Sequence, residues 1–314
     1  MHLIIPYANS CSDGAAAALP TLKLPHLQHL LARLSPLACD PGDDFSLSPP
    51  HERALAAALG LPVADGQIAW AALRARQLGT LDASGAWGFI TLCHWQVNSH
   101  HVAMSHLPLP GLDAGQSDAL LAAMRPYFEE DGLTLHADQP GRWLARGELL
   151  APLASASPDR VVGRNLAPWI PSGQAAAGLR RLQNEMQMLL YTHPVNDART
   201  ACGLVPVNSF WLSGTGALPA GYAPPDSATQ PIVIDSLRSA ALAEDWPGWV
   251  QAWQALDTDQ IKALAQAVGR GETVQLTLCG ERSGQSWLSQ PQSAWQKFKH
   301  LFGTQPAYNL LEKL

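Results

Sequence analysis

Short apolar runs alternate with helix-favouring segments at both ends of the chain, and this pattern constrains the fold more than any other feature. Near the N-terminus an apolar run at residues 3–5 is followed by leucines at near-helical spacing from Leu22 to Leu34. Toward the C-terminus the pattern predicts, in order, a buried strand, two helices and a strand at residues 231–235, 247–256, 259–268 and 273–279. Strands and helices that alternate favour a layered α/β fold with a largely parallel sheet.

The middle third of the chain has a different pattern, in which apolar and polar residues alternate as in half-buried strands. Residues 87–107 show it first, and residues 132–148 repeat it around a turn at 138–141, with a helix expected between them at 117–128. We therefore expect a single domain over residues 1–314 with a strand-rich subdomain at about 86–150.

Further elements and a seam are expected from local signals. A helix closed by Gly60 is predicted at 52–59, after a surface loop at 40–50. A helix capped by Ser172 is predicted at 174–191. The proline-rich stretch at 219–231 is the expected internal seam, unless it is only a long loop.

The composition argues against several classes of function. The formal charge is −6, from 20 basic and 26 acidic residues, and Lys and Arg form no run, so the positive footprint of a nucleic-acid binder is missing. The five cysteines are odd in number and form no C-x-x-C pair, which argues against a disulfide framework or a zinc ribbon. Since we find neither a signal peptide nor a run of about 18 apolar residues, we expect a cytoplasmic protein without membrane contact.

A cluster of histidines in the strand-rich middle is a weak candidate for a metal site. His94, His100 and His106 would share one face of an unbroken strand, where imidazoles can bind zinc. Asn98 and Ser99 are expected to break that strand, and no carboxylate stands at ligand spacing. We expect ordinary surface or core-edge histidines.

Other motifs are weaker still. Trp246, Trp249 and Trp253 share one helical face, which is more typical of core packing than of a ligand platform. The chain has no G-x-S-x-G elbow, no G-x-G-x-x-G fingerprint and no P-loop. These absences argue against a serine hydrolase and against dinucleotide or P-loop nucleotide binding.

The most specific feature is the segment from His193 to Gly216, which we call the signature segment. It is expected to contain a helix end, a polar loop, a strand at 205–212 and a tight turn at 213–216. Polar groups between packed elements must form hydrogen bonds. Either they clamp the preceding helix onto the sheet, which we favour, or they bind a small anion. The candidate residues are His193, Asn196, Arg199, Asn208, Ser213, Gly214, Thr215 and Gly216.

The signature segment resembles the H-P-x-N-x-x-R-x-x-x-G-x-x-P-x-N pattern, followed by G-x-G, of archaeal-type cofactor-independent phosphoglycerate mutases. These enzymes are a branch of the alkaline-phosphatase-like superfamily, so the resemblance implies that layered α/β fold. Weaker similarity extends to residues 20–22 and 41–44. The whole chain more closely resembles the shorter bacterial proteins called RpfE-type regulatory proteins. The matching positions are His193, Pro194, Asn196, Arg199, Gly203, Pro206, Asn208, Gly214 and Gly216.

The chain departs from the family at the positions that carry catalysis. The family has Asp-Gly and a second Asp as metal ligands after the first strand, where this chain has residues 6–9, Pro-Tyr-Ala-Asn. The family's nucleophilic serine pairs with Asp43, and its Asp-His ligands near the C-terminus are replaced after residues 276–279 by Gly280 and Glu281. A phosphoryl transfer between two metals needs those ligands and an activated hydroxyl.

These departures predict a pseudoenzyme, a non-catalytic binding or regulatory protein without a metal or cofactor. Its partner would be another protein or a small anionic ligand. The alternative is a working phosphoglycerate mutase or phosphohydrolase that binds manganese or zinc. It would use Asp13, Asp43, Asp44 and the histidines from His94 to His106.

Overall fold

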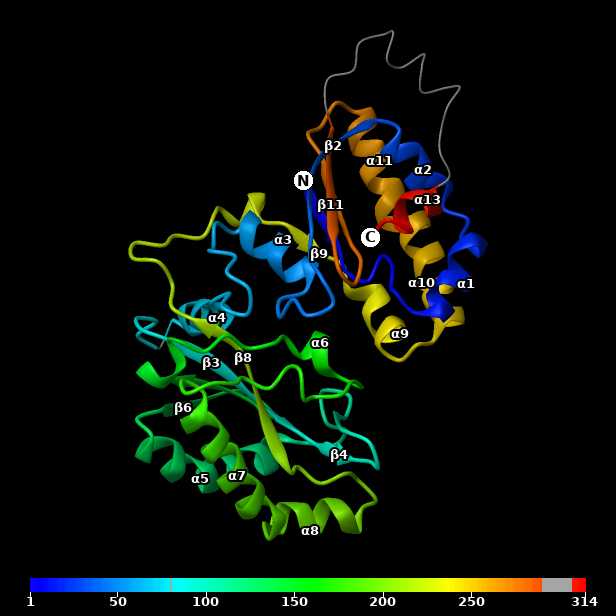
Figure 1. The fold of residues 1–314 in the computed structure, drawn as a ribbon. Helices are drawn as coiled ribbons and strands as arrows, with labels where there is room; N and C mark the ends of the chain where they lie inside the picture. The colour runs from blue at the N-terminus through cyan, green and yellow to red at the C-terminus, as the bar shows by residue number, and fades with distance from the viewer. Residues whose placement is uncertain (80, 290–306) are drawn as a thin grey trace. The chain divides into compact units, whose positions relative to one another are not determined.

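The computed structural model describes residues 1–79, 81–289 and 307–314, and its contacts divide the chain into two compact units (Figure 1). Unit 1 contains residues 1–44, 49–60 and 224–314, and unit 2 contains residues 45–48 and 61–223. One boundary, between Ala223 and Pro224, falls inside the proline-rich stretch expected as a seam. The strand-rich region at 86–150 lies entirely within unit 2.

Unit 1 is built on a mixed five-stranded sheet in the order β2-β11-β10-β1-β9. β1 pairs in parallel with β10 and β9, whereas the central strand β10 pairs antiparallel with β11, and β11 with β2. Because two antiparallel steps separate them, β2 runs in the same direction as β10 and β1. The strands are β1 (His2–Ile5), β2 (Leu34–Asp40), β9 (Ile232–Val233), β10 (Gln275–Cys279) and β11 (Gly284–Ser289).

Helices cover both faces of this sheet. α2, α10 and α11 lie on one face and α3 on the other (Figure 1). The α/β fold class predicted from the sequence is confirmed, but the sheet is mixed rather than largely parallel, and its parallel pairings are those of β1 with β9 and β10. The helices are α1 (Asp13–Ala18), α2 (Pro25–Leu31), α3 (Pro50–Ala58), α9 (Arg238–Leu242), α10 (Trp246–Leu256), α11 (Lys262–Gly269) and α13 (Ala307–Leu311), with short η segments at Leu19–Thr21, Ser227–Thr229, Asp235–Leu237 and Asp257–Ile261.

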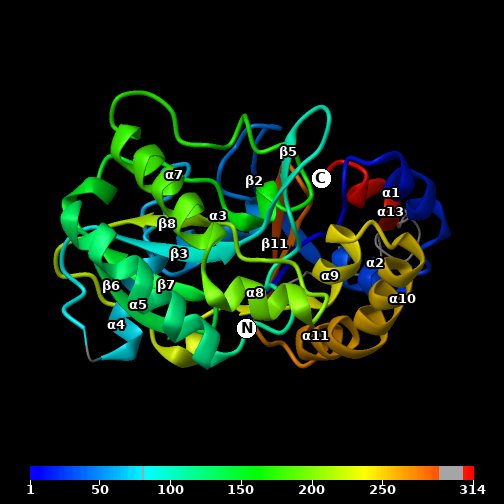
Figure 2. The ribbon, with the colours of Figure 1, turned by 90° about the horizontal axis from the view of Figure 1, so that it is seen from below.

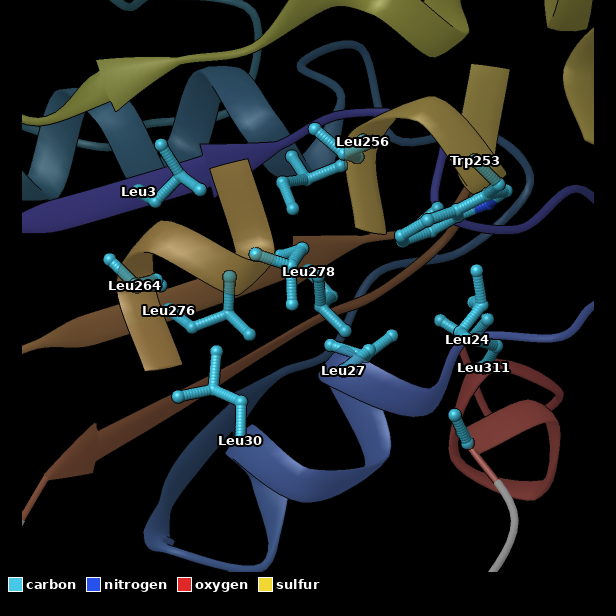
Figure 3. Packing of buried hydrophobic residues seen from close by; sticks show 14 of the residues in the cluster. Leu3, Leu24, Leu27, Leu30, Trp253, Leu256, Leu264, Leu276, Leu278 and Leu311 are labelled. Carbon is cyan, nitrogen blue, oxygen red and sulfur yellow. The ribbon is translucent and has the colours of Figure 1, made fainter. Parts of the chain in front are cut away.

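The core of unit 1 lies between the sheet and α2, α10 and α11 (Figure 3). Leu276 and Leu278 of β10 meet Leu27 and Leu30 of α2 in this layer. The tryptophans predicted as core residues pack edge to face along α10, and Trp249 and Trp253 are fully buried. Aromatic rings in such contacts supply large buried apolar area, which stabilises the helix on the sheet.

Unit 2 is built on an antiparallel sheet in the order β6-β7-β3-β8, beside a separate hairpin of β4 and β5. The strand-rich middle predicted from the sequence is therefore present. Its strands are β3 (Trp87–Cys93), β4 (Trp95–Val97), β5 (Val102–Met104), β6 (Thr134–Gln139), β7 (Arg142–Arg146) and β8 (Ser209–Gly216).

One face of the unit 2 sheet packs against α5 and α7, and α8 follows α7 on this side (Figure 2). The opposite face packs against α4. Leu179, Leu182 and Met186, which the apolar spacing predicts to face the core, are buried in α7, and Leu190 completes the stripe instead of the predicted Leu189, which is half-buried. The helices are α4 (Trp70–Leu78), α5 (Ala114–Glu130), α6 (Pro158–Val161), α7 (Ala177–Tyr191) and α8 (Pro194–Ala201), with an η turn at Glu148–Leu150.

Three predicted elements near the chain ends are wrong in extent. Leu34 belongs to β2 rather than to a helix, because the chain turns after α2. The strand expected to be buried at 231–235 is only the two residues of β9, and Ile232 is 50% exposed because β9 is an edge strand. The helix expected at 259–268 begins at Lys262, after a π-helical turn that continues α10.

Two further corrections concern the signature segment and the helix before it. That helix begins at Ala177 with Ala176 as its N-cap, and Ser172 does not cap it, because Gly173 places a loop with φ +82° in between. The strand predicted at 205–212 begins at Ser209, and the predicted tight turn at 213–216 is the end of β8. Trp87 pairs with Gly216 there, so the strand continues through both glycines.

No helix among the described residues has the length and apolar character needed to cross a bilayer.

Candidate functional site

The signature segment lies wholly in unit 2, where it forms α8, the connection after it and strand β8. His193 is the N-cap of α8, and its Nδ1 accepts a hydrogen bond from the backbone N–H of Val195 at 3.2 Å. Pro194 follows at the first helical position, where its missing N–H costs nothing. Burial lowers the pKa of His193, against the raising effect of Asp197, and favours the neutral ring that this cap requires.

Arg199 is fully buried, with 0% of its surface exposed. Its Nε donates to the carbonyl oxygen of Val205 at 2.9 Å, and its two terminal nitrogens donate to Pro110 O at 3.0 Å and Gln116 Oε1 at 3.2 Å. All three acceptors are neutral. Burial lowers the pKa of the guanidinium, and Asp113 acts in the opposite direction. The fork of Arg199 thus joins α8 to the start of α5 and to the loop before β8.

The two asparagines of the signature segment serve the backbone in the same way. Nδ2 of Asn196 donates to Leu190 O and Val207 O, both at 2.7 Å, and its Oδ1 accepts from Val207 N at 2.7 Å. Asn208 brackets Trp95, accepting from its N–H at 2.7 Å and donating to its carbonyl at 2.9 Å. Asn196 bonds both backbone groups of Val207, and Arg199 bonds the carbonyl of Val205. Because these backbone groups are already hydrogen-bonded, Val205 and Val207 cannot pair in a sheet, and β8 starts only at Ser209.

The end of the signature segment is equally enclosed. Thr215 Oγ1 donates to Leu153 O at 2.6 Å and lies 3.1 Å from Gly66 O. Ser213 is buried in β8 opposite Phe89. Gly214 has φ +61°, and a Cβ there would come within 3.0 Å of the Phe89 ring, so both the backbone conformation and the packing require glycine. Gly216 is as tightly packed, against Gln67 and Ala69.

A pocket of about 580 Å³ lies in unit 1, at the edge of the sheet where β1, β2 and β10 have their carboxyl ends; we call it the strand-end pocket. Ligands of open α/β sheets bind at this edge. The loop after β1 supplies Asn9 and Cys11, the end of β2 supplies Cys39, and the turn after β10 supplies Arg282. None of these four was among the site residues predicted from the sequence.

The loop after β1 is held in an unusual shape. Tyr7 has φ +57°, a left-handed conformation that non-glycine residues adopt at a cost and that clusters at functional sites. Its carbonyl accepts from the indole N–H of Trp249 at 2.9 Å, and the amide of Ala8 donates to Cys279 O at 2.8 Å. Asn9 is only 7% exposed, and its Oδ1 has no hydrogen-bond partner among the described residues. Asn9 thus lines the pocket, while its unpartnered oxygen is enclosed by the protein.

Asp13 and Glu312 line the pocket, and three further acidic side chains beside it are engaged by neighbouring donors. Asp40 accepts from Arg53 Nε at 2.8 Å, and Asp44 accepts from Arg282. Glu281 Oε2 accepts from Ser10 Oγ and from Cys11 N–H, both at 3.0 Å. The bond to Asp44 is the main cause that raises the pKa of the Arg282 guanidinium. These carboxylates complete a network within the protein.

The residues at the strand-end pocket do not match the metal centre that the family resemblance implies. Pairs of catalytic metals need several carboxylates and histidines that converge on one point. Over residues 1–79, 81–289 and 307–314, no three His, Cys, Asp or Glu side chains gather closely enough to hold a metal ion. Asp43, which pairs with the nucleophilic serine, is exposed.

The structure does not bring the histidines of the predicted cluster together. A turn at residues 98–101 separates β4 from β5, so the break expected at Asn98 and Ser99 is confirmed. His94 Nδ1 meets Pro206 O at 2.8 Å, whereas His100 and His101 lie in the turn, where their backbone N–H groups donate to Asn98 Oδ1. His94, His100 and His106 thus come from different local structures.

Comparison with curated proteins finds similarity over a short part of the chain. A stretch of 62 residues is 37% identical to the probable 2,3-bisphosphoglycerate-independent phosphoglycerate mutase of Geobacter sulfurreducens, covering 20% of this chain and 16% of that protein. A stretch of 63 residues is 35% identical to the 2,3-bisphosphoglycerate-independent phosphoglycerate mutase of Methanothrix thermoacetophila, with the same coverage of 20% and 16%. The matched part spans about a sixth of the length of these relatives. No protein-family model matches the chain.

Two solved structures resemble the chain over most of its length. A cofactor-independent phosphoglycerate mutase from Thermoplasma acidophilum aligns with 100% of this chain and 98% of that chain, at 13% identity and a TM-score of 0.36. The PH0037 protein from Pyrococcus horikoshii aligns with 92% of this chain and 87% of that chain, at 12% identity and a TM-score of 0.40. The two curated relatives support the resemblance to phosphoglycerate mutases inferred from the sequence over the short stretch that they match.

Proposed function

We propose that the protein is a non-catalytic binding or regulatory protein on a phosphoglycerate-mutase-like scaffold, similar to the RpfE-type regulatory proteins. Its ligand would enter the strand-end pocket. The observation that carries the proposal is the state of three acidic side chains beside the pocket: Asp40, Asp44 and Glu281 are each hydrogen-bonded to an arginine, a hydroxyl or a backbone N–H. Carboxylates with such partners support the loops around a pocket, and a metal would have to displace those donors.

The expected ligand is a small anion, or another protein that presents one. Arg282 and Lys313 line the pocket together with the acidic residues Asp13 and Glu312, and the two cations can attract negative charge. All five cysteines lie in the described part of the chain as thiols, which fits the cytoplasmic location we propose.

The signature segment has a structural role in this proposal. Arg199, Asn196 and Asn208 donate to backbone carbonyls and a neutral side chain rather than toward a ligand. Buried polar groups satisfied in this way fix the elements they join. The segment would then hold α8 and β8 on the unit 2 sheet in a protein that no longer needs it for catalysis.

The test is an assay of the interconversion of 3- and 2-phosphoglycerate with added manganese, paired with elemental analysis of the purified protein. We expect no turnover above the protein-free rate and no stoichiometric metal. Turnover that disappears on chelation and returns with the metal would overturn the proposal. The variant Asp13→Ala separates a true site from contamination, because Asp13 lines the pocket and any activity of this chain through it should fall.

The second candidate function is a working metal-dependent phosphoglycerate mutase or phosphohydrolase. It is favoured by the two curated relatives, both of which carry the mutase name. In that case Asp13, Asp43 and Asp44 would supply the metal ligands, and the ion pair between Asp44 and Arg282 would have to open. The same assay decides between the two functions.

A further inference from the structure

Unit 2 has an open groove of about 550 Å³ between α5 and α7, next to the start of α8; we call it the α5–α7 groove. Its lining is mostly apolar and includes Ala123 and Tyr127 of α5, Met188 and Leu189 of α7, and Pro194 of α8. The groove lies wholly within unit 2 and shares no residue with the strand-end pocket.

Large apolar side chains at this groove are left in contact with solvent. The face of α7 away from the sheet is otherwise polar, yet Met188 is 74% exposed, and Tyr191, one turn later, is 83% exposed. Tyr127 on the α5 side of the groove is 38% exposed. Methionine and tyrosine are enriched where proteins bind one another, and exposed apolar patches mark such surfaces. The groove therefore offers apolar area that a partner can bury.

Carboxylates surround this apolar area on three helices. Glu185 of α7 lines the groove itself. Glu130 follows Tyr127 by three residues on α5, and Asp197 follows Pro194 by three residues on α8. Residues three apart are neighbours on a helix surface, so both carboxylates, which are exposed, lie beside the lining residues.

Basic side chains do not balance these carboxylates. Unit 2 contains no lysine. Arg181, one turn before Glu185 on α7, is already paired with Asp131. Arg125 lies on another face of α5, because residues two apart in a helix do not face each other. The rim of the groove is therefore negative, and a partner with Lys or Arg beside its apolar residues complements it.

The walls of the groove also favour one backbone conformation for the partner. The backbone groups of α5 and α7 are bonded within each helix, so an extended peptide could not pair with them as an added strand. A helix satisfies its own backbone and presents apolar side chains three and four residues apart, which pack into a groove between two helices.

We propose that the α5–α7 groove binds a basic amphipathic helix of a partner protein. The apolar face of that helix contacts Tyr127 and Met188, and its Lys or Arg side chains lie near Glu130, Glu185 and Asp197. The inference goes beyond the proposed function, and its test is independent of the ligand of the strand-end pocket.

The experiment measures the binding of a fluorescent synthetic peptide to the full-length protein by anisotropy. The probe has about 15 residues, all Leu or Lys, with the leucines spaced to form one apolar face of a helix. One control peptide has the same composition without an apolar face, and the other has Glu in place of Lys. We expect the probe to bind at least about tenfold more tightly than either control.

Two substitutions with matched controls place the binding in the groove. Met188→Lys should weaken binding at least about tenfold, because it removes an apolar contact and repels a basic helix. Val97→Lys adds the same charge at a similarly exposed apolar side chain of the β4–β5 hairpin and should change the affinity less than about twofold. Glu185→Gln should weaken binding about two- to fivefold at low salt, whereas Glu148→Gln, at an exposed carboxylate outside the groove, should leave it unchanged.

Three results would overturn the proposal: no binding of the probe, no preference for it over the control peptides, or equal affinities for Met188→Lys and Val97→Lys. Light scattering supplies a further test. A wild-type dimer that Met188→Lys dissociates would show that a second copy of the chain covers the groove, and the proposed partner would then be wrong.

Discussion

The signature segment and the strand-end pocket differ in where their polar groups point. In the signature segment, Arg199 and Asn196 use their side-chain nitrogens on neighbouring carbonyls and a glutamine side chain. In the pocket, Asn9 keeps a buried oxygen without a partner among the described residues, and Cys11 is exposed. A conspicuous polar motif can therefore belong to the fold, while the candidate site lies in a less conspicuous loop.

Among substitutions in these two regions, Arg199→Ala should lower the stability of the protein most. It leaves the oxygens of Val205, Pro110 and Gln116 without their donor and opens a cavity, so the free energy of unfolding should fall by about 2–4 kcal/mol. Arg199→Lys should be nearly as harmful, because an ammonium cannot reproduce the planar fork. Denaturant unfolding measures both. The matched control is Arg270→Ala, and a loss for Arg199→Ala no larger than for this exposed residue would contradict the structural role.

A smaller effect is expected for Thr215→Val, which keeps the shape of the side chain and removes its hydroxyl. The carbonyl of Leu153 then loses a buried donor, and stability should fall by about 1–2 kcal/mol. Thr229→Val is the control, since Thr229 makes a similar bond to Asp226 O in an exposed turn. Thermal unfolding should give a lower midpoint for Thr215→Val than for Thr229→Val. Equal midpoints would show that the buried hydroxyl of Thr215 stabilises the fold no more than the exposed hydroxyl of Thr229.

The pH dependence of stability tests the polar contacts of the unit 1 sheet. His2 Nε2 lies 2.8 Å from Thr277 Oγ1, and burial, followed by the charge of the chain's amino group, lowers the pKa of His2 from 6.5 to about 4. Between these values the unfolded chain binds the proton and the folded chain does not, so stability falls as the pH decreases from about 6.5 to about 4. After allowance for partial exposure, the contribution is about 1 kcal/mol.

Unfolding of the wild type and of His2→Gln, followed from pH 7 to pH 4, measures this contribution. The difference between the two proteins should change with pH in the window given by His2. A difference that stays constant over that window would show that His2 has the same pKa in both states.

The smallest effect is expected for Asn9→Ala. The substitution removes an acceptor that has no hydrogen-bond partner in the described structure, so stability should change by no more than about 0.5 kcal/mol. A site residue that serves a ligand rather than the fold behaves in this way. Denaturant unfolding gives the value, and a loss as large as that of Arg199→Ala would remove the contrast between the two regions.

Much of the fold could be predicted from the sequence, because the patterns that define it are local. The apolar stripe of α7 and the alternation around β6 and β7 led to elements that the structure contains. The errors come from tertiary contacts. Val205 and Val207 look like strand residues, yet Asn196 and Arg199 claim their backbone groups, and β8 begins later. Ile232 looks like a core residue but lies on an edge strand.

The candidate site was harder to predict, because it depends on strand order. Asn9, Cys39 and Arg282 are far apart in sequence and come together because β1, β2 and β10 run in the same direction. One available signal was the family resemblance, which placed expected ligands after the first strand and near the C-terminus. The chain has different residues at those positions, and the sequence alone does not show that they meet at one pocket, because that depends on the order of the strands in the sheet.

Whether Arg199 serves the fold or an anion is decided by the denaturant unfolding of the wild type and Arg199→Ala, each with and without phosphate. If Arg199 serves the fold, the variant loses stability, and added phosphate shifts the unfolding of both proteins by the same amount, since Arg199 is not the anion site. A variant as stable as the wild type that has lost a phosphate-induced shift shown by the wild type would contradict the account. That result would place an anion site in the signature segment.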